Sequence, residues 1–284
     1  MSFKNNEIKS IEYACNGKTL TFSKPRVMAI VNLTPDSFYD GGRYSGVNDV
    51  LRDVEEKIKG GASIIDIGAS STRPGAIEIS EEEEWKRLQP VLTAIRKYFS
   101  DIFISVDTYR SAIATKGAGE GADIINDISG GNFDDKMFVT LAQLQLPYIL
   151  MHIKGTPANM QIAPEYKDVV KEVSEELQLK IKQLEKVSFN KIIVDPGFGF
   201  GKTPEHNFQL LKALSQIGGN FPMLAGVSRK SMINRIIKTN PVTSLNGTTV
   251  VNTIALLNGA GILRVHDALE AKQAIELVEY YKKV

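Results

Sequence analysis

Carboxylate and carboxamide side chains end several short apolar runs of this sequence. Asp107, Asn126 and Asp195 each stand at or near the end of such a run, and Arg264 and His266 lie two residues apart at the end of another. These groups are costly to bury without a partner. Carboxylates and an amide suit a planar heterocycle with ring N–H, amino and carbonyl edges. The arginine and the histidine supply donors for a phosphate or a carboxylate.

Polar residues follow all eight of the apolar runs. The set comprises Asn32, Thr72 with Arg73, Asp107, Asn126 with Asp127, His152, Asp195, Ser228 with Arg229 and Lys230, and Arg264 with His266. A single member of this set is better explained as a cap or as a hydrogen-bonded core residue than as part of a site. Eight such positions at one end of the strands instead indicate a site that binds a heterocycle and an anion together. Arg73 and Lys230 add positive charge for the anion.

The sequence offers no nucleophile with a partner base. No serine stands in a G-x-S-x-G elbow, and the single cysteine, Cys15, lies outside the polar set. The run DPGFGFGKT (195–203) resembles a phosphate-binding P-loop, but Pro196 replaces its first glycine and the run follows the sixth apolar run rather than the first. Its glycines predict close approach of the backbone to a ligand, with Phe200 either against an aromatic substrate or packed on the rim of the site.

Short apolar runs alternate with longer amphipathic segments, a pattern typical of parallel strands joined by helices. The runs are 26–32, 63–67, 102–107, 123–128, 147–152, 191–195, 222–227 and 261–265. Helices are expected at Glu81–Tyr98, Glu165–Glu185, Pro204–Ser215 and Ala268–Tyr281. Eight units predict a closed (β/α)₈ TIM barrel, an α/β fold. An open doubly wound sheet is the alternative, although no glycine-rich dinucleotide turn follows the first run.

No linker or repeat divides the chain, so residues 1–284 are predicted to form one domain. Residues 7–22 alternate around Asn16-Gly17 and predict an N-terminal β-hairpin that plugs the floor of a barrel spanning about 26–284.

Composition excludes several classes of protein. The 284 residues are 43% hydrophobic and 24% charged, which excludes disorder, coiled coil and collagen. The net charge of +1 provides no general field for nucleic acid or an anionic membrane, and neither is expected as a partner. No apolar run reaches the roughly 18 residues of a membrane-spanning helix. The start MSFKNNEIKS lacks the apolar core of a signal peptide, and Cys15 has no partner for a disulfide, so we expect a reducing cytoplasm.

Eight segments, in order along the chain, are similar to those of a known family. They are NLTPDSFYDGG (32–42), DIGASSTRPGA (66–76), SVDTYR (105–110), INDISGG (125–131), MHIKGTP (151–157), DPGFGFGK (195–202), GVSRKS (226–231) and RVHD (264–267). From about residue 26 to its C-terminus the chain resembles the dihydropteroate synthase family of folate biosynthesis.

The resemblance implies a transferase that joins 4-aminobenzoate to 6-hydroxymethyl-7,8-dihydropterin diphosphate, releasing diphosphate by an SN1-like path. It also implies Mg²⁺, a homodimer and a sulfonamide target. By their match to the family motifs, Thr72, Asp107, Asn126, Asp195 and Lys230 are expected to bind the pterin. Arg264, His266, Asn32 and Lys230 are expected at the diphosphate, with Asn32 also at the metal. Arg73, Pro74, Phe38, Phe200 and Ser231 are expected around 4-aminobenzoate.

One position departs from the family pattern. Ser70 stands where the family commonly has a glutamate before Ser-Thr-Arg, which puts any role of that glutamate in doubt. Two other functions stay open. A pterin-barrel methyltransferase that acts with a corrinoid protein needs neither the Arg264-x-His266 pair nor the STRPGA loop, and a catalytically idle paralogue binds pterin without turnover.

Overall fold

Eight parallel strands close into a barrel in the computed structural model, which describes residues 11–33, 46–70, 78–160, 162 and 164–284. In chain order they are β3 (Arg26–Asn32), β4 (Ile64–Gly68), β5 (Phe103–Asp107), β6 (Ile124–Asp127), β7 (Tyr148–Met151), β8 (Ile192–Asp195), β9 (Met223–Ala225) and β10 (Ala260–Val265). β10 pairs with both β9 and β3, which closes the ring. The predicted TIM barrel is confirmed, and the open sheet is wrong.

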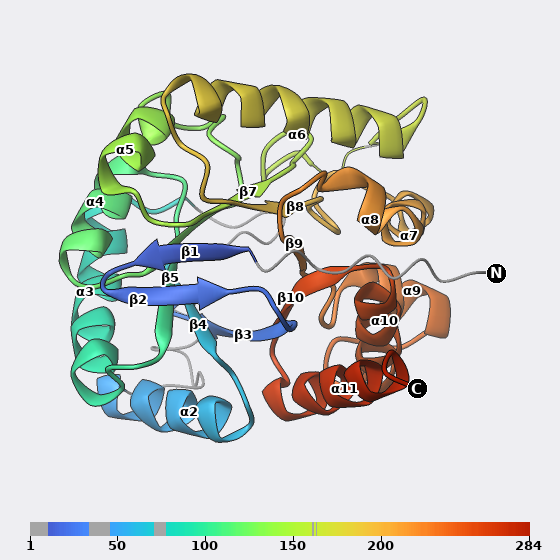
Figure 1. Ribbon diagram of the computed structural model, residues 1–284, viewed down its shortest axis with the longest axis horizontal. Coiled ribbons are helices and arrows are strands. Elements are labelled where there is room, and N and C mark those ends of the chain that lie inside the picture. The colour runs from blue at the N-terminus through green and yellow to red at the C-terminus, as the bar shows by residue number, and fades with distance from the viewer. Residues whose placement is uncertain (1–10, 34–45, 71–77, 161, 163) are drawn as a thin grey trace.

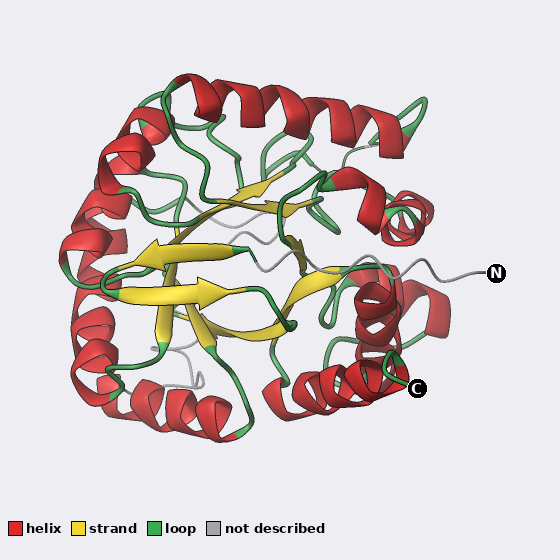
Figure 2. Cartoon of the chain, in the orientation of Figure 1, coloured by secondary structure: helices red, strands yellow, loops and turns green. Residues whose placement is uncertain are grey.

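Helices surround the ring of strands (Figures 1 and 2). They are α2 (Val47–Lys59), α3 (Glu81–Tyr98), α4 (Ser111–Gly119), α5 (Met137–Leu144), α6 (Val169–Lys186), α7 (Pro204–Lys212), α8 (Leu214–Ile217), α9 (Ser231–Ile237), α10 (Leu245–Leu257) and α11 (Ala268–Tyr281). α6 begins later than predicted because Asp168 caps it, accepting from the Lys171 amide at 3.1 Å. The helix predicted from Pro204 is divided into α7 and α8 at Ala213. No helix within the described ranges is long and apolar enough to cross a membrane.

The strands are near-continuous apolar runs because both of their faces are buried. In β4, Ile65 and Ile67 pack in the outer layer against the helices, whereas Ile64 packs inside the barrel near the start of the strand. Since side chains alternate along a strand, Asp66 also points into the barrel, one layer above Ile64. The lower layer of the interior is apolar and the upper layer carries the polar groups of the site.

The predicted N-terminal hairpin is present and lies across the ring of strands in Figure 1. β1 (Glu12–Cys15) pairs with β2 (Lys18–Thr21), and Asn16 and Gly17 form the two-residue turn with φ of 44° and 73°. Side chains of the hairpin pack against residues near the start of the barrel strands. An ion pair of 2.7 Å between Lys18 and the buried Asp123 fixes it there. Residues 7–10 of the prediction lie outside the described part of the chain.

Candidate active site

Arg264 joins two carboxylates at the upper end of the barrel. Its Nε donates to Asp66 Oδ2 at 2.6 Å, and its Nη2 donates to Asp107 Oδ2 at 2.7 Å. The three residues come from β10, β4 and β5, so the closed barrel brings together positions far apart in the chain. The sequence predicted Arg264 at an anion and Asp107 at a heterocycle. In the free protein these two residues bond to one another.

Asn126 reaches the same cluster from β6. Its Nδ2 donates to Asp66 at 3.2 and 3.4 Å, and both side chains are buried. Because a carboxylate only accepts hydrogen bonds, this contact fixes the amide orientation and leaves Asn126 Oδ1 as an acceptor. The site therefore presents acceptors from Asp107, Asn126 and Asp195, which complement the N–H and amino groups of a heterocycle.

Asp195 and Lys230 form the opposite side of the cluster. Asp195 is buried at the end of β8 and accepts from the Gly197 amide at 2.7 Å. Its Oδ2 and Lys230 Nζ lie 3.9 and 3.8 Å from the position that a Cβ at Gly226 would occupy. Both groups thus lie on the same side of Gly226, each at ordinary van der Waals distance from that position.

Phe200 provides an apolar surface beside these charges. Lys230 Nζ lies 4.7 Å from the centroid of its ring, a cation–π distance, and also donates to the Phe198 carbonyl. The ring packs against a small buried cluster of Ile128, Met151, Ile153 and Met160. Phe200 is only partly buried, so its packing on this rim leaves part of the ring available to a planar ligand.

Burial controls the charges of the site. It raises the pKa of Asp107 to about 7, although the Arg264 cation opposes that shift. Burial likewise lowers the pKa of Lys230 to about 8 against the attraction of Asp195, and raises the pKa of Asp195. Burial opposes the charge of Arg264, but Asp66 and Asp107 together raise its pKa above the ordinary value. Arg264 is the permanent cation of this cluster.

His266 lies beside the cluster on the loop after β10. Its Nδ1 is 3.1 Å from Ser228 Oγ, which also accepts from the His266 amide at 3.3 Å. Burial and the neighbouring Arg264 lower the pKa of His266 to about 4. At neutral pH the imidazole of the free protein is therefore uncharged. The neutral imidazole can form a hydrogen bond with a ligand. The positive charge for the diphosphate expected at this pair comes from Arg264 alone.

The loops after β9 and β10 are joined by a bidentate ion pair. Arg229 bonds both carboxylate oxygens of Asp267 at 2.9 and 2.7 Å and donates to the Pro241 and Val242 carbonyls. Its backbone φ is 56°. These partners of the Arg229 guanidinium lie outside the polar cluster, and Arg229 supports the two loops that carry Lys230 and His266.

Two other predicted residues lie at the edge of the cluster. Asn32 is exposed at the end of β3, paired in register with Gly68, and Gly68 is in turn paired with Asp107. Ser231 is exposed as the first residue of α9, directly after Lys230. The remaining predicted residues lie outside the described part of the chain: Phe38, Thr72, Arg73 and Pro74.

The described flanks of the segment 71–77 are held by arginines. Arg87 donates to the Ala69 carbonyl at 3.2 Å on one side, and Arg110 donates to the Ile79 carbonyl at 2.7 Å on the other. Arg110 also bonds the buried Glu84. Ala69 and Ile79, on either side of residues 71–77, are thus both held by arginine side chains, and Ser70 itself carries no carboxylate.

Two polar strand-end residues do not join the cluster. Asp127 is buried and accepts from the Ser129 and Gly131 amides and from the Tyr148 hydroxyl, so it organises its own turn. His152 is buried and bonds Lys202 and Glu176 instead. Asp127 and His152 are therefore hydrogen-bonded core residues, as the sequence allowed for any single strand-end residue.

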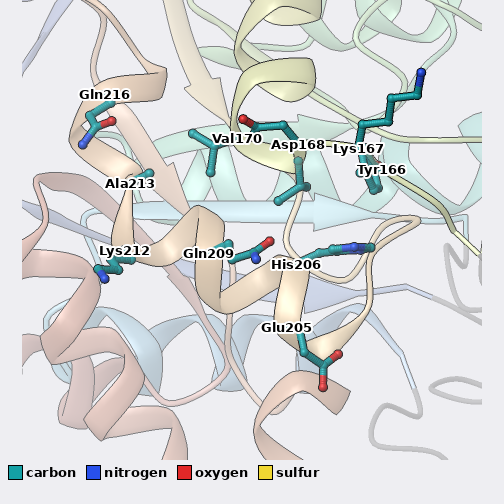
Figure 3. Close-up of a pocket in the computed structure, with 11 residues that line it drawn as sticks. Tyr166, Lys167, Asp168, Val170, Glu205, His206, Gln209, Lys212, Ala213 and Gln216 are labelled. Atoms are coloured by element: carbon teal, nitrogen blue, oxygen red, sulfur yellow. The ribbon is translucent and has the colours of Figure 1, made fainter.

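A groove of about 720 Å³ lies between the start of α6 and the whole length of α7, and it reaches Gln216 of α8 (Figure 3). Tyr166, Asp168 and His206 are among the residues that line it. None of the predicted site residues that the structure describes contributes to this lining. The groove is separate from the polar cluster at the barrel mouth.

Comparisons with known proteins agree with this geometry. The model of the pterin binding enzyme family matches residues 28–266. Dihydropteroate synthase of Escherichia coli K12 is 42% identical over 266 residues, covering 93% of this chain and 94% of that protein. The chain belongs to the dihydropteroate synthases of the pterin-binding enzyme family. The resemblance seen in the eight motifs is therefore confirmed.

Solved structures of the family share the fold over nearly the whole chain. A Yersinia pestis dihydropteroate synthase in complex with a sulfonamide drug has a TM-score of 0.91 and 40% identity, and covers 96% of this chain and 100% of that chain. The Xanthomonas albilineans enzyme in complex with 7,8-dihydropteroate has a TM-score of 0.87 and 33% identity, with coverage of 96% and 100%.

Sequence reasoning missed Asp66, which lies at the centre of the cluster. The available signal was an aspartate inside the apolar run SIIDI, two residues after Ile64 and therefore on the same face of the strand. A carboxylate there requires a buried partner, and Arg264 is that partner. The contact joins residues 198 positions apart, so only the closed barrel identifies it.

Proposed function

We propose that this protein joins 4-aminobenzoate to 6-hydroxymethyl-7,8-dihydropterin diphosphate, forming 7,8-dihydropteroate and releasing diphosphate. The observation that carries the proposal is the cluster of Asp107, Asn126 and Asp195 with the cations Arg264 and Lys230 at one end of the barrel. The acceptors suit the donor edge of a pterin, and the cations suit its diphosphate. Relatives that carry this activity in their names support it.

The proposed reaction begins with loss of diphosphate from the exocyclic carbon. Ionised Asp107 and Asp195 accept from the pterin and favour the positive charge that spreads over it as the C–O bond breaks. Arg264 and Lys230 stabilise the negative charge of the leaving diphosphate, and His266 contributes a hydrogen bond. The arylamine nitrogen then attacks the methylene carbon and afterwards loses a proton. An aniline is mostly neutral at pH 7, so this SN1-like path requires no strong base from the protein.

We propose 4-aminobenzoate beside Phe200 and Ser231. The Phe200 ring lies next to Lys230 and is partly open, and Ser231 is exposed immediately after that lysine. An aromatic amine on this side approaches a pterin held by Asp195. The same pocket is the proposed target of sulfonamides, because these drugs resemble 4-aminobenzoate and a relative is solved with one.

Mg²⁺ is the proposed cofactor. No group of three or more His, Cys, Asp or Glu residues that could hold a metal is found among the described residues. Mg²⁺ is nevertheless commonly held by one or two protein groups together with substrate phosphates and water. The carboxamide of Asn32, exposed at the end of β3, fits that role as a single ligand. When bound there with the substrate, Mg²⁺ would neutralise diphosphate charge.

We further propose a homodimer. Val250, Ile254 and Leu257 lie on successive turns of α10 and are 52%, 37% and 41% exposed, an apolar stripe beside the exposed Ile236 and Ile237 of α9. A second copy of the chain would cover this face. Light scattering should report a dimer for the wild type and a monomer for Ile254→Glu, and a wild-type monomer would contradict the proposal.

A reducing cytoplasmic location is also proposed. It is supported by the single cysteine, Cys15, which has no second cysteine in the chain with which to form a disulfide.

Measuring diphosphate release and dihydropteroate formation together tests the proposed activity. We expect equal amounts of the two products when both substrates and Mg²⁺ are present, and no dihydropteroate when either substrate is left out. An idle pterin-binding protein would bind pterin and form neither product. A corrinoid-dependent methyltransferase would transfer a methyl group from a methylated pterin. Either outcome would contradict the proposal.

A further inference from the structure

Residues 195–202, the last residue of β8 and the loop that follows it, contribute Asp195 and Phe200 to the candidate site. We call this segment the 195–202 loop. Gly197, Gly199 and Gly201 all have positive φ, of 69°, 85° and 67°. Such a backbone is open to many conformations in the unfolded chain, since glycine restricts φ so little. Something must therefore hold this segment in one shape if its two functional side chains are to keep their places.

Lys202 turns back under this loop with its amine buried. Its Nζ donates to the Phe200 carbonyl at 2.9 Å, to the Gly197 carbonyl at 3.0 Å and to His152 Nδ1 at 2.9 Å. An ammonium has three N–H donors, and these three acceptors satisfy all of them. The His152 carbonyl lies further away, at 3.4 Å. In the P-loop-like run DPGFGFGKT the lysine thus binds its own loop, away from the phosphate position that the motif suggests.

His152 completes the arrangement from the end of β7. Because its Nδ1 accepts from Lys202, the ring proton lies on Nε2, which donates to Glu176 Oε2 at 3.2 Å. Glu176 in turn pairs with Lys180 at 3.5 Å. The backbone of Gly197 also packs so closely on the His152 carbonyl that a Cβ would collide with it. The loop is therefore attached to β7 through both the side chain and the backbone of His152.

We infer that Lys202 is a positioning residue that holds the 195–202 loop through its three hydrogen bonds, so that Asp195 and Phe200 face the pterin and 4-aminobenzoate. The inference rests on the proposed function for the identity of the two ligands. Burial lowers the pKa of Lys202 to about 7 against the attraction of Asp195, and burial lowers that of His152. Both shifts agree with groups held away from water, and the ammonium with three donors is the form of Lys202 below its pKa.

The test compares Lys202→Met with Lys180→Met. Lys180 is a matched control because it is also buried, also bonds a backbone carbonyl, Ser129 O at 3.2 Å, and belongs to the same network without touching the loop. Lys202→Met should raise both the Kd for pterin and the KM for 4-aminobenzoate by about tenfold, as expected when buried carbonyls lose their donor. The Lys180→Met constants should stay within about threefold of the wild type.

Amide hydrogen exchange across residues 195–202 gives a readout that does not depend on catalysis. Exchange in Lys202→Met should be about tenfold faster than in wild type, and unchanged in Lys180→Met. A folded Lys202→Met with wild-type constants and protection would overturn the inference, as would equal losses in both variants. If wild type showed no turnover, the proposed function would fail while the exchange measurement still decided whether Lys202 holds the loop.

If Lys202→Met does not fold, variants of His152 test whether the bond between Lys202 and His152 holds the 195–202 loop. His152→Asn keeps an acceptor oxygen near the position of Nδ1, whereas His152→Leu removes it. The inference predicts that loop protection and pterin affinity survive in His152→Asn and fall in His152→Leu. Equal behaviour of two folded His152 variants would overturn it.

Discussion

Arg264 donates from Nη2 to Asp107 Oδ2 at 2.7 Å, so the residue proposed to bind the leaving diphosphate contacts a residue proposed to bind the pterin. The same guanidinium is held by the buried Asp66 at 2.6 Å. Asp66 is not proposed to contact substrate. Its bond to Arg264 should therefore remain when a bound pterin replaces Arg264 as the hydrogen-bond partner of Asp107. The pterin ring and the diphosphate of one substrate are thus expected to be bound by Asp107 and Arg264, and each of these residues influences the charge of the other.

Arg264→Ala separates the effect of Arg264 on diphosphate departure from its effect on pterin binding. Since a leaving diphosphate concentrates negative charge in the transition state, kcat should fall by at least about tenfold, or about 1.4 kcal/mol. The Arg264 cation also lowers the pKa of Asp107 against burial. Its loss should therefore weaken binding of free pterin more at pH 7 than at pH 9, measured against wild type at each pH by calorimetry.

A purely structural Arg264 predicts a different result. If the residue only braces the barrel rim, Arg264→Ala would melt at a lower temperature and keep its specific activity. Melting temperature and diphosphate release are to be measured on the same preparation. An active but destabilised variant would refute the role of Arg264 in diphosphate departure.

The dependence of kcat/KM on pH should be bell-shaped. Asp107 must be ionised to accept from the pterin, so activity is lost as pH falls through its pKa of about 7. Lys230 must be protonated to attract diphosphate, so activity is lost as pH rises through its pKa of about 8. His266, with a pKa of about 4, should add no limb near neutrality. Asp107→Asn should shift the acid limb, because only Asp195, whose pKa burial also raises, then remains to be protonated. An unchanged limb in this variant would assign it to another group or to the substrate.

Gly68 allows Asp107 to approach the adjacent strand. A Cβ at Gly68 would lie 3.2 Å from Asp107 Cβ, which is tighter than ordinary contact. Gly68→Ala should shift the carboxylate and weaken pterin binding by several-fold, about 1 kcal/mol. Gly119→Ala is the control, because a Cβ there meets nothing within 4 Å and α4 gains a better helix former. Equal pterin affinity in the two variants would show that Asp107 does not need this space.

The barrel was predictable from sequence because its strands are buried on both faces and read as apolar runs. Asn16-Gly17 likewise specified the hairpin turn through residues that tolerate positive φ. Strand bounds were less accurate, since the predicted run 222–227 contains only the three-residue β9. Apolarity continues past the last ladder bond there, so composition alone does not mark the end of a strand.

The site was predictable in its residue types but not in its internal contacts. Position at a strand end marked Asp107, Asn126 and Asp195, but also His152, which serves the 195–202 loop. Whether a strand-end residue contacts the cluster or a neighbouring loop depends on tertiary contacts such as that between His152 and Lys202. The bond from Asp66 to Arg264 depends on barrel closure, which no local pattern encodes.

Pterin affinity of Asp195→Asn tests the site assignment most directly. Asp134→Asn is the matched control, because it makes the same change in a carboxylate that caps the Ser111 amide outside the cluster. Calorimetry with a pterin should show at least about tenfold weaker binding for Asp195→Asn, from loss of a charge-assisted hydrogen bond of about 1.5–3 kcal/mol. Asp134→Asn should bind like wild type. Wild-type affinity in a folded Asp195→Asn would contradict the placement of the pterin at this end of the barrel.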